Sequence, residues 1–251
     1  MHRRHKKPYA VIFVVVVALV VFGALRDIEL TNNPPPPERT ATRMHYADDA
    51  HDFEKLPRDT SPVLVRTGTA EQQANGHYTF TPSDIAPITL PQREVILAFS
   101  LKGDLPPSYI DFAGMLQETL NTWKRKNNKI TEIMLEWQGD TADIQKMVTL
   151  ANDIYMHMKT DYWIGYGLQR KWFEADPAQA ALLATRQQGI RDYVFDIHEA
   201  SREGETLPDT LAALNSYGIP FMLRTDQAPD EKEALALMDA HDKFLGFVVV
   251  R

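Results

Sequence analysis

The chain has 251 residues, of which 44% are hydrophobic and 24% are charged, as is ordinary for a folded globular protein. This composition excludes disorder throughout and a membrane protein with several spans. The absence of cysteine excludes a disulfide scaffold, a thiolate zinc site and a cysteine nucleophile. The net charge of −7 argues against a nucleic-acid partner.

The N-terminus carries a basic tip followed by an apolar stretch. Residues 9–25 are uncharged and rich in valine, and residues 1–7 hold four basic side chains. At about 1.5 Å per residue, a helix over 9–25 spans roughly 25 Å, enough for a hydrocarbon core. We therefore predict that 1–25 is a cytoplasmic tip with a single-pass signal anchor in the inner or plasma membrane. The C-terminal domain is then extracytoplasmic, and periplasmic in a Gram-negative cell. A cleaved signal peptide is the alternative, although no clear cleavage site follows the apolar run.

Residues 26–60 are predicted to form a stalk. The segment NNPPPPE at 32–38 favours a stiff polyproline II spacer, and 38–62 has few aliphatic residues and no regular period. The next segment, 61–92, contains strand-like pieces at 63–65 and 77–80 around a loop with Gly, Asn and Gln. These pieces predict a β-hairpin.

From residue 93 to 251, apolar runs of strand length alternate with helical stretches. The predicted strands are 95–101, 130–137, 163–168, 193–198, 220–225 and 244–250. The predicted helices are 108–126, 141–159, 175–188, 206–216 and 229–241. Strands separated by single helices indicate right-handed βαβ units and a parallel sheet.

Side-chain alternation distinguishes an open sheet from a barrel. In the strands at 193–198 and 220–225, Phe195 and Leu223 lie on one face, and Asp196 and Arg224 lie on the other. An open sheet would bury such charges beneath apolar helices, at a cost of several kcal/mol each if they were unpaired. In a barrel the polar strand ends line the mouth, where sites on this fold are found. We therefore predict an α/β fold, a parallel TIM-barrel-like βα repeat behind one transmembrane helix.

Three segments carry a family resemblance: IMLEWQGDTADIQKM (133–147), YWIGYGLQRKW (162–172) and RDYVFDIHEA (191–200). Over 93–251 the chain resembles the glycoside-hydrolase-like (β/α)8 barrels, and in particular an uncharacterised bacterial domain family within that group. The resemblance implies a barrel and glycosidase-type chemistry. Only about six βα units are visible and a full barrel needs eight strands, so we expect an incomplete barrel, which a protein partner could complete.

Polar residues at the predicted strand ends form the candidate site. Glu136 and Asp196 are the candidate catalytic pair, because a glycosidase uses two carboxyl groups. The candidate substrate-binding residues are Lys102, Gln138, Trp163, Gln169, Trp172, His198, Arg224 and Asp226. The alternative is that these charges are structural, with Lys102 pairing Glu136 and Arg224 pairing Asp196.

Other chemistries have less support. His198 lacks a second histidine at ligand spacing, so we predict no metal site, and no cofactor is indicated. Trp163 and Trp172 are candidates for stacking on a sugar, whereas Trp137 and Tyr166 have outward parity and are expected beneath helices. The leading hypothesis is a membrane-anchored cell-envelope protein that binds or hydrolyses a glycan. The rival is a scaffold or assembly factor whose open sheet edge pairs with another chain.

Overall fold

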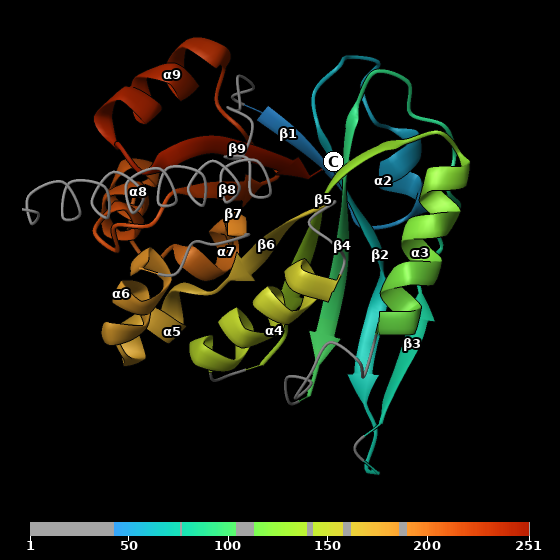
Figure 1. Ribbon diagram of the computed structural model, residues 1–251. Helices are drawn as coiled ribbons and strands as arrows, with labels where there is room; N and C mark the ends of the chain where they lie inside the picture. The colour runs from blue at the N-terminus through green and yellow to red at the C-terminus, as the bar shows by residue number, and fades with distance from the viewer. Residues whose placement is uncertain are drawn as a thin grey trace, which may run out of the picture. The chain divides into compact units, whose positions relative to one another are not determined.

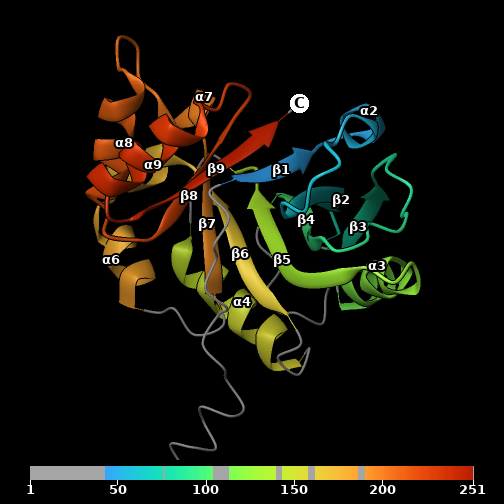
Figure 2. The same cartoon turned by 90° about the horizontal axis from the view of Figure 1, so that it is seen from above.

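The computed structural model describes residues 43–75, 77–103, 113–139, 143–157, 162–185 and 190–250. In these ranges the strands form one sheet in the order β1-β9-β8-β7-β6-β5-β4-β2-β3, and β1 also pairs with β2. All the pairings are parallel except that between β2 and β3. The eight parallel strands therefore close into a barrel, and β3 extends it as one arm of a hairpin (Figures 1 and 2).

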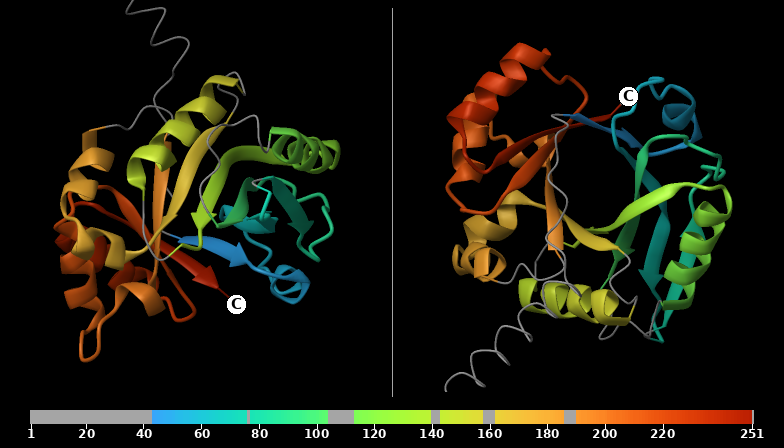
Figure 3. Two further views of the ribbon diagram at one scale, coloured as in Figure 1. Left: turned by 90° about the horizontal axis from the view of Figure 1, so that it is seen from below. Right: turned by 45° about the horizontal axis from the view of Figure 1, so that its top comes forward.

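The barrel strands occur in chain order with helices between most of them. The strands are β1 (Arg43–Ala47), β2 (Val63–Gln72), β4 (Glu94–Lys102), β5 (Lys129–Trp137), β6 (Trp163–Leu168), β7 (Ile190–Asp196), β8 (Phe221–Thr225) and β9 (Phe244–Val250). The helices are α2 (Ala50–Glu54), α3 (Ala113–Arg125), α4 (Ile144–His157), α5 (Arg170–Ala175), α6 (Ala178–Thr185), α7 (Ile197–Ala200), α8 (Leu207–Asn215) and α9 (Glu231–Ala240). The helices lie around the outside of the strands (Figure 3).

Alternation along the strands produces two apolar cores. The inner one fills the barrel and consists of Met44, Tyr46, Leu64, Ile96, Ala98, Met134, Val194, Met222 and Val248. The outer one lies between barrel and helices, and includes Phe99, Phe195 and Leu223. The predicted parity of the strands at 193–198 and 220–225 is confirmed, because Phe195 and Leu223 are buried in the outer core.

The predicted incomplete barrel is wrong, because the structure contains all eight strands. β1 comes from 43–47, inside the predicted stalk, and its residues Arg43–Tyr46 pair with Phe247–Val250 of β9. β9 therefore has neighbours on both sides, and the open edge that suggested a completing partner is closed. The stalk prediction does not hold for 43–60, which form β1, α2 and the loop to β2.

The segment 61–92 contains a hairpin, but its strands pair at residues other than the predicted 63–65, and its first strand also belongs to the barrel. Val63–Val65 of β2 pair with β1, whereas Gly68–Gln72 pair antiparallel with β3 (Tyr78–Pro82). Gly68 lies at the switch, beside a register shift against β4. Its φ of +154° and its closeness to the Thr81 carbonyl, 2.4 Å from an ideal Cβ, leave room only for glycine.

No helix in the described residues is long and apolar enough to cross a bilayer. The predicted anchor at 9–25 and the proline run at 34–37 lie outside those residues.

Candidate functional site

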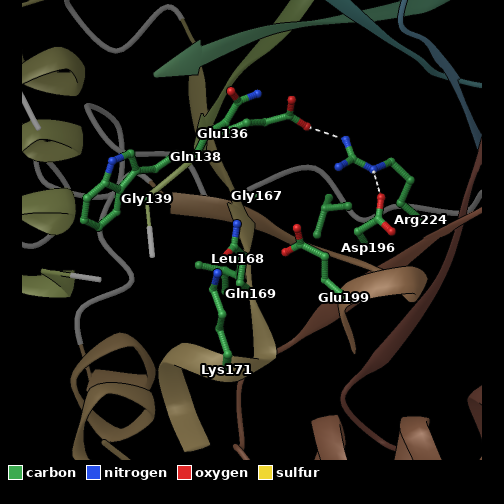
Figure 4. A pocket seen from close by; sticks show the side chains of 12 residues that line it. Glu136, Gln138, Gly139, Gly167, Leu168, Gln169, Lys171, Asp196, Glu199 and Arg224 are labelled. Atoms are coloured by element: carbon green, nitrogen blue, oxygen red, sulfur yellow. Dashed lines mark hydrogen bonds and ion pairs between the residues drawn. The ribbon is translucent and has the colours of Figure 1, made fainter. Parts of the chain in front are cut away.

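Three charged side chains meet at the carboxyl ends of the strands, on the inner face of the barrel. Glu136 stands near the end of β5, Asp196 ends β7, and Arg224 lies near the end of β8. The guanidinium of Arg224 donates from Nη1 to Glu136 Oε1 at 2.7 Å and from Nε to Asp196 Oδ2 at 2.9 Å. Figure 4 shows both carboxylates directed toward this one cation. We call Glu136, Asp196 and Arg224 the mouth cluster.

The surroundings of Arg224 stabilise its charge. Burial acts to lower the pKa of Arg224, but the nearby Glu136, Tyr46 and Asp196 outweigh burial, and the pKa is raised above its ordinary value. The Tyr46 ring also lies against the guanidinium, with the Arg224 Cζ 4.8 Å from the ring centroid. Arg224 is therefore a fixed cation at the centre of the mouth.

Asp196 uses both carboxylate oxygens for structure. Oδ2 accepts from Arg224, and Oδ1 accepts from the backbone N–H of His198 at 2.9 Å, which makes Asp196 the N-cap of α7. This cap explains why β7 ends at Asp196 and why His198, predicted to be the last strand residue, lies in a helix. Glu136, by contrast, has only Oε1 engaged in the hydrogen bonds described.

The first two strands add polar groups that the sequence-based prediction missed. The Tyr46 hydroxyl donates to Asp48 Oδ1 at 2.8 Å, and Arg66 Nη1 donates to the same oxygen at 3.0 Å. Burial first, and then Glu136, raise the pKa of Tyr46 well above its ordinary value. Tyr46 lies within β1, Asp48 follows it and Arg66 lies within β2, and no distinct polar motif surrounds them, so no signal in the sequence placed them at the mouth.

Two cavities adjoin at the mouth. One has a volume of about 340 Å³ and is bordered by Gly167, Gln169, Lys171 and Glu199, and we call it the β6 cavity. The other has a volume of about 420 Å³ and we call it the β1 cavity. It is bordered by Tyr46, Asp48, Asp52, Arg66, His198 and Asp226. The mouth cluster and Gln138 line both cavities.

The structure brings together most of the predicted polar residues. Gln138 lines both cavities, Gln169 lines the β6 cavity, and His198 and Asp226 line the β1 cavity. The predicted pair of Asp196 and Arg224 is confirmed. Lys102, at the end of β4, is exposed and lines neither cavity, and Glu136 pairs with Arg224 rather than with Lys102.

The two tryptophans predicted to stack on a sugar lie elsewhere. Trp163 is the first residue of β6, at the end opposite the mouth, and its ring lies 6.1 Å from that of Tyr155 in α4. Trp172 is buried in α5 against Trp137, with ring centroids 5.6 Å apart. The parity of Trp163 indicated the inner face, but as the first residue of its strand it lies far from the carboxyl end where the site is found.

The outward positions of Trp137 and Tyr166 are confirmed. Both rings belong to the outer core, and Trp137 Nε1 donates to the Gly103 carbonyl at 2.8 Å. The Tyr166 hydroxyl donates to the Met147 carbonyl in α4. Each polar atom thus has a partner beneath the helices.

A second ion pair, between Arg170 and Glu205, lies outside the mouth and joins elements of the fold. Arg170 is buried, and its Nη1 and Nη2 donate to the two carboxylate oxygens of Glu205 at 2.6 Å and 3.0 Å. It also donates to the Ala200 carbonyl at 2.8 Å. These bonds tie α5 to the segment between α7 and α8. In the described residues, no group of three or more His, Asp or Glu side chains could hold a metal ion.

A comparison with protein-family models and with curated proteins found no match for this chain. The parallel eight-stranded barrel is the TIM-barrel-like fold that the sequence resemblance implied.

Proposed function

We propose that this protein is a cell-envelope protein, anchored in the membrane through residues 9–25, whose barrel mouth binds a glycan. The observation that carries the proposal is the mouth cluster, which lines two adjoining cavities at the carboxyl ends of the strands. In barrels of this fold, that end holds the ligand site. The charge pattern of residues 1–25 supports the anchor.

The lining suits a ligand rich in hydroxyl groups. Pocket walls that offer carboxylates, amides and cations can accept hydrogen bonds from hydroxyls and donate to them. Gln138 and Gln169 supply amides, Glu136 supplies a carboxylate, and Lys171 supplies an ammonium. The cavity volumes, about 340 and 420 Å³, fall in the range of roughly 300–1,000 Å³ that is usual for small-molecule sites.

The predicted pair of Glu136 and Asp196 suits ligand binding better than hydrolysis. Glycoside hydrolysis needs one carboxyl group that carries a proton and a second that attacks or activates water. Asp196 has both oxygens engaged, with Arg224 and with the His198 N–H. Within the mouth cluster only Glu136 keeps an oxygen outside the described hydrogen bonds, so both cluster carboxylates hold Arg224 and one of them can also meet a ligand.

The experiment is a binding screen of the full chain in a detergent without sugar headgroups. Neutral, amine-bearing and acidic oligosaccharides are tested, and each mixture is examined for released sugar. We expect the protein to bind at least one hydroxyl-rich oligosaccharide without cleaving it. Release of sugar would assign hydrolysis in place of binding. No binding to any member by a folded protein would refute the proposal.

A further inference from the structure

The two mouth cavities differ in what surrounds them but share one wall. Both are lined by the mouth cluster and by Gln138. The β6 cavity lies over β5, β6 and β7, and the β1 cavity reaches β1, β2 and β8. A ligand in one cavity therefore touches the same Glu136 and Arg224 as a ligand in the other.

Gly167 on β6 leaves the space of the β6 cavity free of a side chain. Gly167 pairs with Glu136 on one side and with Val194 on the other. A Cβ at Gly167 would stand 3.1 Å from Glu136 Cγ, a contact tighter than ordinary van der Waals packing. Any larger side chain would have to move Glu136 or fill the space between β5 and β7. Gly167 thus leaves the inner face of β6 bare at the level of the mouth cluster.

Gln169, which lines the β6 cavity, carries a buried amide oxygen that has no protein partner among the described residues. It is the residue before α5, and its side chain makes no capping hydrogen bond. Among the described residues, its Oε1 is buried without any hydrogen-bond partner. A buried acceptor without a partner is unfavourable, and a ligand hydroxyl that reached this oxygen would give it one.

We infer that the β6 cavity and the β1 cavity are two subsites for one ligand of at least two sugar-sized units, and that Gly167 determines access to the β6 subsite. This inference rests on the proposed function and adds to it the minimum length of the ligand. The ligand crosses the mouth cluster, so Glu136 lies beside the linkage between its units. Each cavity is large enough for one sugar unit, and the shared wall makes the two units neighbours.

The test is a calorimetric titration of the full chain with a mono-, di- and trisaccharide of the same neutral sugar. For the wild-type protein we expect the affinity to rise at least tenfold from monosaccharide to disaccharide. Gly167→Val fills the β6 subsite at the level of the mouth cluster, and we expect it to abolish that rise. Gly114→Ala is the control, because nothing lies within 4 Å of a Cβ at Gly114, and it should keep the full rise.

A second variant guards against misfolding of Gly167→Val. Gln169→Met removes the acceptor but keeps the length of the unbranched side chain, and it should reduce the rise from monosaccharide to disaccharide. If the wild-type protein binds sugars with no gain for the disaccharide, or if both variants keep the gain, the two-subsite inference is overturned and the proposed function stands. If the folded wild-type protein binds no sugar, both are overturned.

Discussion

Arg224 Nη1 donates to Glu136 Oε1 at 2.7 Å, although the two residues are 88 positions apart in the chain. Their side chains are only 21% and 12% exposed, so this ion pair is largely shielded from water. It joins β8 to β5 across the inside of the barrel, and Asp196 on β7 completes the bridge at 2.9 Å. The mouth cluster therefore contributes to stability as well as presenting polar groups to a ligand.

Replacing Arg224 by methionine should destabilise the protein by roughly 2–3 kcal/mol, because two shielded carboxylates lose their common cation. The measurement is urea unfolding at neutral pH. Lys129→Met is the control, since the Lys129–Glu94 pair involves a lysine that is 68% exposed, and its loss should cost at most about 0.5 kcal/mol. Equal losses in the two variants would contradict the shielding of the mouth cluster.

Removal of residues 1–59 should prevent folding, whereas removal of residues 1–37 should not. The shorter fragment, 60–251, lacks β1, which pairs with both β9 and β2 and buries Met44 and Tyr46 in the inner core. Its loss opens the barrel and leaves two unpaired strand edges, which favour aggregation. Circular dichroism and thermal unfolding of the two fragments distinguish these outcomes. A cooperative melting transition in 60–251 would show that β1 is dispensable.

The carboxylate of Asp59 should make stability fall with acid. Burial acts to raise its pKa, but the Ser61 N–H, Arg93 and His45 outweigh burial and lower the pKa from 3.8 to about 2. A pKa that is lower in the folded state adds stability above pH 4, and this stability is lost as the pH falls from about 4 to 2.

The matching variant is Asp59→Asn. The Asp59 side chain is 47% exposed, so after allowance for solvent screening the effect is about 1 kcal/mol at neutral pH. We expect Asp59→Asn to be less stable than the wild type at pH 7 and close to it at pH 2, measured by urea unfolding at a series of pH values. A difference that stays constant with pH would refute the assignment.

Acidic sugars should bind more weakly than neutral ones. Beyond the mouth cluster, the β1 cavity is bordered by Asp48, Asp52 and Asp226 against the single cation Arg66. Like charges in a partly enclosed site repel an anionic ligand, and salt screens this repulsion. A uronate disaccharide should therefore bind at least tenfold more weakly than its neutral counterpart at low salt, with a smaller difference at high salt. Tighter binding of the uronate would contradict this electrostatic picture.

The later strands could be predicted because each is a continuous apolar run with clear alternation. β4, β5, β6, β8 and β9 lie within one residue of their predicted bounds. The same alternation predicted that Asp196 and Arg224 share the inner face. Side-chain alternation in the sequence was therefore enough to predict that Asp196 and Arg224 lie together in the site.

β1 and the place of β2 in the barrel could not be predicted, because the connections of these strands lack helical periodicity. Between β1 and β2 the chain forms only the five-residue helix α2, and between β2 and β4 it forms the β3 hairpin. β1 itself reads RMHYA, in which only Met44 and Tyr46 show the apolar face. Because neither strand was counted in the barrel, the sequence predicted an incomplete barrel. The contributions of Tyr46, Asp48 and Arg66 to the mouth were missed for the same reason.

The most direct test of the account is a titration of the full chain and of Glu136→Gln with a neutral disaccharide that the wild-type protein binds. Glu136 lines both cavities and keeps one carboxylate oxygen outside the described hydrogen bonds. We expect at least tenfold weaker binding in the variant. Unchanged affinity in a folded Glu136→Gln protein would place the ligand away from the barrel mouth and contradict the account.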